Sequence, residues 1–227
     1  MAQLFDKILG SPSGELGDMV FRRKKGGNII AKQPVHRATP LSDAEKAFRS
    51  KFGLAGRLAC KINSIQVLKD VWPKGTGKGS KCNEILKANY NSINTAADLG
   101  EVLVSPLFGF SVANAVLTAG PTGIHFAADA LGVNVGIDTS IEKSVVTAGI
   151  VVLTTPTKAG IPALQVLAFK SIQHNLDLIN PIDHTVEFNG GTLNLYSEYT
   201  TRRVFASLVT LDDAGKGVRY STTFSSL

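Results

Sequence analysis

Cysteine is scarce in this chain of 227 residues, which contains only Cys60 and Cys82. The two lie far apart in the sequence, form no Cys-x-x-Cys pair and have no histidine at the spacing of a metal ligand. This pattern excludes the disulfide framework of small secreted domains and the usual zinc sites. We therefore predict two buried free thiols and no bound metal ion.

Long hydrophobic runs are also missing, because Gly, Pro and charged residues interrupt every apolar stretch before it could span a membrane. Near the N-terminus, Asp6 and Lys7 fall inside the segment that would have to be the apolar core of a signal peptide. We predict a soluble globular protein with no membrane partner, made in the reducing cytoplasm without a signal peptide. Departure from the cell inside an assembled particle such as a virion, or by a route that needs no N-terminal signal, stays open.

Catalytic motifs are absent as well. The glycine-rich stretch Gly75–Ser80 lacks the GxxxxGK[ST] spacing of a phosphate-binding loop, because Gly79 separates Lys78 from Ser80. No GxSxG nucleophile motif accompanies the neighbouring residues Asp183 and His184. The sparse carboxylates of the second half, Glu142 among them, are expected in turns or on outward-facing strand positions. We predict no catalytic residue and no cofactor, and hence a protein that is not an enzyme.

Positive charge is concentrated in the first half of the chain. The formal net charge is +6, yet residues 1–100 contain 17 Lys and Arg against 8 Asp and Glu, and residues 101–227 contain 7 against 10. A basic half is therefore joined to a mildly acidic half.

The first 41 residues have the pattern of a hairpin between two irregular segments. Met19–Phe21 lead into a run of four cations, Gly26 and Gly27 supply a turn, and Asn28–Lys32 return with two isoleucines. Several glycines before the hairpin indicate an irregular arm. Pro34 and Pro40 indicate an extended linker, because each disfavours helix at the preceding residue. We predict a Gly-rich arm, a basic β-hairpin and a linker over residues 1–41.

A helical period begins at Ser42, where Ser42 and Glu45 fit a capping box. Apolar residues recur every three or four positions, which predicts a helix with this stripe as its buried face: Ala44, Ala47, Phe48, Phe52, Ala55, Leu58, Ala59, Ile62 and Ile65. The helical segment ends near Trp72. A second helix begins after Ser80, with Cys82, Ile85, Leu86, Asn89, Tyr90 and Ile93 on its inner side. We predict an αα-hairpin over residues 42–99.

The remaining residues, 100–227, have the pattern of an antiparallel immunoglobulin-like β-sandwich. Short segments rich in Val, Ile, Leu, Phe and Thr are separated by turn residues, at 101–107, 112–118, 122–128, 144–154, 163–172, 183–188, 192–199, 202–211 and 217–225. Asn189–Gly191 and Asp212–Gly217 predict two hairpin turns. Val204–Leu211 is apolar on both faces, which predicts a central strand. The predicted fold class of the whole chain is therefore α+β.

Four segments resemble those of an uncharacterised protein family common in Bacteroidota and their mobile elements. The family begins with a hairpin of the form G-x-x-G-x-x-V-F-x-x-x-x-G, matched by Gly14–Phe21, and continues with an R-x-x-F helix, matched by Arg49–Phe52. Cys82–Ile93, which contains Ala88-Asn89-Tyr90-Asn91, and Val204–Phe224 resemble its second helix and its last hairpin. The resemblance implies an immunoglobulin-like C-terminal domain. It implies no functional residue, because none is established in the family.

The basic residues are the one feature that predicts a partner. The candidate contact residues are Arg22, Arg23, Lys24, Lys25, Lys32, Arg37 and Arg49. We expect a non-enzymatic structural or assembly protein, such as a phage virion component, that docks onto neighbouring subunits through its basic arm and helices and forms an oligomer. The alternative is a polyanion-binding or nucleic-acid-binding module that uses the basic hairpin.

Overall fold

The chain contains two compact units, Met1–Asp43 and Ala44–Leu227. The computed structural model describes residues 2–4, 14–24, 27–32, 40–75, 79–93, 99–132 and 136–226. The boundary between the units lies close to the end of the predicted linker. The helices and the β region, on either side of the predicted boundary at residue 100, lie in the same unit.

The N-terminal unit holds a four-stranded antiparallel sheet with strand order β1-β4-β3-β2. Its strands are β1 (Ala2–Leu4), β2 (Gly14–Leu16), β3 (Met19–Lys24) and β4 (Gly27–Lys32). The predicted hairpin is confirmed by pairs such as Phe21 with Ile30. Of the two predicted turn residues, Gly27 lies in β4 opposite Lys24, and Gly26 lies outside the described residues. The predicted irregular arm is wrong at β2. Gly17, with φ of +55°, reverses the chain so that β2 pairs with β3.

Three helices open the second unit: α1 (Asp43–Ser64), α2 (Gln66–Val71) and α3 (Lys81–Tyr90). Both predicted helical segments are confirmed. The Ser80 side chain accepts a hydrogen bond from the Asn83 amide (3.3 Å) and so begins α3. Trp72 ends α2 in an extended conformation and donates its indole N–H to the Val104 carbonyl (2.9 Å), which fixes the helices to the loop after them.

The main sheet of this unit has strand order β12-β11-β7-β8, with two short strands, β13 on β11 and β9 on β7. Its strands are β7 (Ser144–Pro156), β8 (Leu164–Lys170), β9 (His174–Asn175), β11 (Tyr199–Leu211), β12 (Gly217–Tyr220) and β13 (Phe224–Ser225). The predicted central strand is confirmed, because β11 pairs with both β7 and β12. The predicted hairpin around Asp212–Gly217 is confirmed by the same pairing of β11 with β12.

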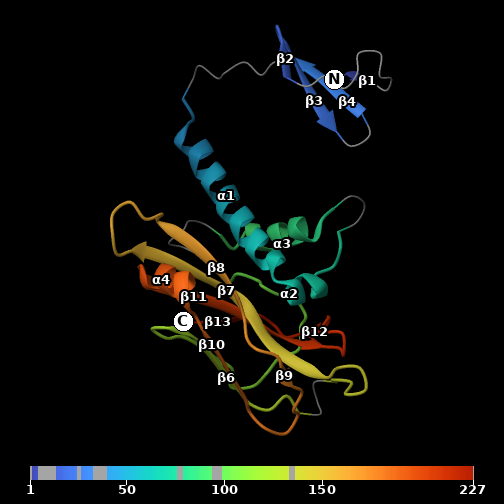
Figure 1. The fold of residues 1–227 in the computed structure, drawn as a ribbon, viewed down its shortest axis with the longest axis vertical. Helices are drawn as coiled ribbons and strands as arrows, with labels where there is room; N and C mark the ends of the chain where they lie inside the picture. Colours follow the sequence, from blue (N-terminus) through green and yellow to red (C-terminus); the bar gives the residue numbers. More distant parts are fainter. Residues whose placement is uncertain are drawn as a thin grey trace. The chain divides into compact units, whose positions relative to one another are not determined.

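Successive side chains of the central strands point to opposite faces of the sheet and contribute to two separate hydrophobic cores. On β7, Ile150 and Val152 belong to a cluster with α1, α2 and α3, whereas Val151 and Leu153 belong to a cluster with a second antiparallel sheet. That sheet has order β10-β6-β5 and consists of β5 (Val116–Ala119), β6 (Gly123–Ala128) and β10 (Ile182–Glu187). The three helices thus cover one face of the main sheet and the second sheet covers the other, in a mixed α+β fold (Figure 1).

The predicted hairpin at Asn189–Gly191 is wrong, because residues Gly190–Ser197 form the helix α4. The sequence from 192 to 199 alternates as a strand would, but Leu193 and Tyr196 are also three positions apart. Burial of the Tyr196 ring and the hydrogen bond from its hydroxyl to the Gly120 carbonyl (2.8 Å) favour the helix. Short apolar runs of this kind fit both periods, and tertiary contacts decide between them.

The predicted strand over 101–107 is also wrong. This segment has no strand partner, because side chains satisfy its backbone: Asn89 accepts from the Leu103 amide (2.6 Å), and Thr223 accepts from the Val104 amide (3.0 Å). The predicted strand over 112–118 is shortened and shifted to β5.

The predicted burial of both thiols is wrong. Cys60 is exposed and Cys82 is half-buried. On α1 the buried stripe includes Leu58, Ala59 and Ile62, and position 60 falls about 100° around the helix from Ala59, outside that stripe.

Candidate docking surface

Those candidate contact residues that the structure describes are divided between the two units. Arg22, Arg23 and Lys24 lie on β3 and Lys32 on β4 of the N-terminal unit, whereas Arg49 lies on α1 of the other unit. Lys25 and Arg37 lie outside the described residues. The strand register places Arg22 opposite Ile29 and Lys32 opposite Met19, and therefore puts the exposed Arg22 and Lys32 on opposite faces of the sheet.

The N-terminal half of α1 presents apolar side chains to solvent. The predicted stripe is buried from Ala55 to Ile65, but Phe48 is 61% exposed and Phe52 is 52% exposed. Ala44 and Ala47, which continue the stripe, are exposed too. The expectation that the whole stripe is buried is therefore wrong for the first turns of the helix.

Helix length explains why the described part of the second unit leaves this half of α1 uncovered. With 22 residues α1 is about 33 Å long, whereas α3, with 10 residues, is about 15 Å long. A short partner helix cannot cover a long amphipathic one from end to end. The mismatch between the two predicted helices was the sequence signal that could have located this exposed surface.

Side chains from α1 and α3 shape the exposed apolar surface into a shallow groove. The rings of Phe48 and Tyr90 meet edge to face with centroids 6.3 Å apart, and the Lys51 ammonium lies 4.8 Å from the centre of the Tyr90 ring. The groove has a volume of about 370 Å³. We call its four apolar side chains the aromatic face: Phe48, Phe52, Leu86 and Tyr90.

The surroundings of the aromatic face are basic. Arg49 and Lys87 are exposed, and Lys51 is half-buried against Tyr90. The carboxylate of Glu84 is engaged by the Lys87 ammonium at 2.9 Å. Residues 44–93 contain ten Lys and Arg against three Asp and Glu. An apolar groove with a basic rim suits a partner surface that is apolar at its centre and acidic at its edge.

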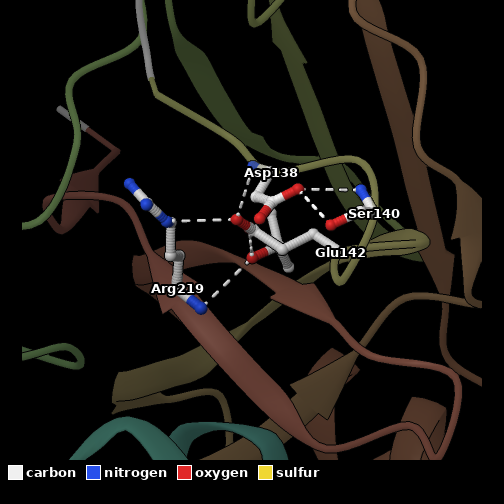
Figure 2. A network of polar contacts seen from close by, with 5 residues as sticks. Asp138, Ser140, Glu142 and Arg219 are labelled. Carbon is white, nitrogen blue, oxygen red and sulfur yellow. Dashed lines mark hydrogen bonds and ion pairs between the residues drawn. The ribbon is translucent and has the colours of Figure 1, made fainter.

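A second cluster of polar groups, around Glu142, closes the turn before β7 (Figure 2). Glu142 lies directly after this turn, one of the two kinds of position predicted for it, and its carboxylate is buried there. It accepts from the Asp138 amide (3.0 Å), forms an ion pair with Arg219 Nε (3.1 Å) and accepts from the Thr210 hydroxyl. Asp138 in turn accepts from the amide and the hydroxyl of Ser140 (2.9 and 2.6 Å), and these bonds lower the pKa of its carboxyl. Both Glu142 oxygens are occupied, so the cluster is suited to holding the turn.

Two stacked histidines lie beside a groove of about 210 Å³ at one end of β7 and β10. The rings of His174 and His184 are parallel with centroids 4.0 Å apart, and Thr147 Oγ1 bonds His184 Nδ1 at 2.7 Å. Burial and the neighbouring His174 lower the pKa of His184 to about 4, against the smaller opposite effect of Asp183. His184 is therefore suited to packing as a neutral ring against His174. Within the described part of the chain, no three His, Cys, Asp or Glu side chains are grouped so as to hold a metal ion.

Comparison with protein-family models, with curated proteins and with solved structures found no match. The resemblance to the Bacteroidota family stays a prediction. Among the described helices, none is both long and apolar enough to cross a membrane.

Proposed function

We propose that the protein is a non-enzymatic assembly subunit, in a phage virion or a comparable particle, whose aromatic face docks onto a second copy of the chain. The exposure of Phe48 and Phe52 on an amphipathic helix is the observation that carries this proposal. Burying one such half-exposed ring in an interface contributes about 1–2 kcal/mol. Two rings, with Leu86 and Tyr90 beside them, supply the apolar centre that a stable contact needs.

Charge distribution favours a second copy as the partner. Residues 44–93 carry a clear excess of positive charge, whereas residues 101–227 contain seven Lys and Arg against ten Asp and Glu. A head-to-tail contact would bring the basic helices of one copy to the mildly acidic β region of the next. Contacts of this heterologous kind build rings or filaments. We further propose that the two antiparallel sheets, which share a core, are related as in an immunoglobulin-like sandwich.

The mass of the protein in solution tests the docking proposal. Size-exclusion chromatography with light scattering, over a salt series, should give a mass above that of the monomer at low salt and a decrease as salt rises. The double variant Phe48→Ser, Phe52→Ser should be monomeric at every salt concentration with an unchanged melting temperature, because neither ring belongs to the core.

Met19 provides the control, since it is a 44% exposed apolar side chain on β3 of the N-terminal unit, which contributes neither side of the proposed contact. The variant Met19→Ser should associate as the parent does. A parent protein that is monomeric at all salt concentrations contradicts the proposal, and so does equal association by the Phe48, Phe52 variant.

A second candidate function is polyanion binding by the basic hairpin, favoured by the four consecutive cations from Arg22 to Lys25. Cations of this kind bind nucleic acid by releasing its counterions, which gives a steep dependence on salt. Substituting all four with Ser should weaken binding to single- and double-stranded DNA equally and reduce the salt dependence. Unchanged affinity in that variant would exclude the hairpin as the site.

A further inference from the structure

The two cysteines of the chain are brought into contact by α1 and α3. The Sγ atoms of Cys60 and Cys82 are 3.9 Å apart, although the residues are 22 positions apart in the sequence. Cys60 is exposed near the end of α1, and Cys82 is half-buried in the first turn of α3. Each helix also contributes fully buried side chains, such as Ile62 and Ile85, to the same core, which holds the two cysteines near each other.

We propose that Cys60 and Cys82 are a redox-active pair that forms an intramolecular disulfide when the protein meets a small-molecule disulfide. Thiols already in contact need only rotate their side chains to reach the bond distance of about 2 Å. This inference does not depend on the proposed docking function. Two cysteines that the fold kept apart would instead each retain a mixed disulfide with the reagent.

The reaction proceeds by two exchanges. The Cys60 thiolate attacks one sulfur of the small-molecule disulfide, forms a mixed disulfide and releases one thiolate of the reagent. Cys82, as its thiolate, then attacks the Cys60 sulfur and releases the second thiolate. The two protons lost by the cysteines go to the two departing thiolates. Two protein thiols and one disulfide thus give one protein disulfide and two small thiols.

Exposure and charge assign the order of these steps. Cys60 is open to solvent, whereas burial and the adjacent Cys60 raise the pKa of Cys82, so that its thiol stays protonated near neutral pH. The flanking cations Arg57 and Lys61 are both exposed and suit an anionic reagent such as oxidised glutathione. Cys60 is therefore the cysteine that attacks the reagent first, and Cys82 is the resolving cysteine.

Closure of the bond would link the two helices that carry the aromatic face. The cross-link restricts the unfolded chain between residues 60 and 82, including the glycine-rich segment before Ser80. Restriction of a loop of this length is expected to raise the melting temperature by about 5–10 °C. The two helices that carry the aromatic face would be held together most rigidly in an oxidising environment, such as that outside the cytoplasm.

Titration of the reduced, full-length protein with oxidised glutathione tests the proposal. We expect free thiols to fall from two to none, the intact mass to fall by about 2 Da with no retained glutathione, and a peptide linking Cys60 to Cys82 to appear. A reductant should restore both thiols. The rate of ring closure, followed from the mixed disulfide, should increase with pH, because Cys82 must lose its proton.

Two single variants distinguish the roles of the two cysteines. Cys82→Ser should stop at a stable glutathione adduct on Cys60, and Cys60→Ser should react much more slowly than the parent. Three results would overturn the proposal: a stable adduct on the parent protein, an intermolecular disulfide as the main product, or unreacted thiols. The thiol count and mass do not depend on oligomeric state once the protein is denatured, so a failed docking test leaves this test intact.

Discussion

Glu142 is a buried carboxylate whose two oxygens both have partners, and those partners come from three separate segments. The Asp138 amide, the Thr210 hydroxyl and the Arg219 guanidinium converge on it from the turn before β7, from β11 and from β12. A charge that has lost its water must be compensated by such bonds, because an unpaired buried carboxylate is costly. The carboxylate therefore ties the turn to the edge of the main sheet.

Replacement of Glu142 by Gln should lower the free energy of unfolding by about 2 kcal/mol. The amide is nearly the same size but loses the ion pair with Arg219, and it cannot accept at both positions. Urea denaturation followed by circular dichroism measures the change. Glu187→Gln, at an exposed position of β10, is the control and should change stability by less than about 0.5 kcal/mol. Equal stability of the two variants would mean that the hydrogen bonds and the ion pair of Glu142 make no net contribution to the free energy of unfolding.

His184 makes the stability of the fold depend on pH. Its pKa is about 4 in the folded protein and 6.5 when unperturbed, so the unfolded chain binds the proton more tightly. Stability from this group is complete above about pH 6.5 and is lost as the pH falls toward 4. The groups that face the ring are His174, stacked on it, Thr147 and the neighbouring Asp183. We expect a loss of about 1–2 kcal/mol, reduced because solvent reaches the adjoining groove.

Thermal denaturation of His184→Gln between pH 7 and pH 4 checks this expectation. The variant should have a flatter dependence of melting temperature on pH than the parent, whatever its stability at pH 7. Thr185→Ala, at an exposed position of the same strand, is the control and should keep the pH dependence of the parent. A parent protein that is equally stable at both pH values would show that His184 keeps an ordinary pKa.

At the level of elements, Asn89 connects α3 to the loop after it. The side chain is fully buried, donates to the Leu103 carbonyl (2.9 Å) and accepts from the Leu103 amide (2.6 Å). It thus replaces a strand partner for a segment that has the composition of a strand. Asparagine is suited to this because one side chain supplies both a donor and an acceptor.

Replacement of Asn89 by Ala should destabilise the fold by about 2–4 kcal/mol, because it removes a fully buried polar side chain and leaves both backbone groups of the half-buried Leu103 without partners. Asn83→Ala is the matched control on the same helix, at an exposed position. Chemical denaturation of the two variants measures the difference. A variant Asn89→Ala as stable as Asn83→Ala would show that water satisfies Leu103 equally well.

Local patterns predicted the long elements and several short strands, and failed at α4 and at residues 101–107. The helical period of α1, the Ser80 cap of α3 and the doubly apolar β11 each follow from the residues of one segment. The helix α4 and the loop at 101–107 depend instead on bonds to distant residues, Gly120 and Thr223. The aromatic face was missed for a related reason. Periodicity shows which side of a helix is apolar, but the length of its neighbours decides how much of that side is covered.

At the scale of the whole molecule, the two units have separate hydrogen-bonded sheets. Among the described residues, both core clusters begin at or after Leu54 and include nothing from the N-terminal unit. A unit with its own closed core can fold without its neighbour. The chain from residue 41 onward should therefore fold alone.

Removal of residues 1–40 also separates the two candidate functions. The shortened protein keeps the aromatic face and the charge difference between its helices and its β region, so its association should equal that of the full chain. It lacks the four hairpin cations, so any binding of DNA should weaken and lose most of its salt dependence. Its melting temperature should stay within about 3 °C of the parent value. Loss of association with DNA binding retained would reverse the assignment of the two functions to the two units, and a shortened chain that does not fold would show that the second unit needs the first.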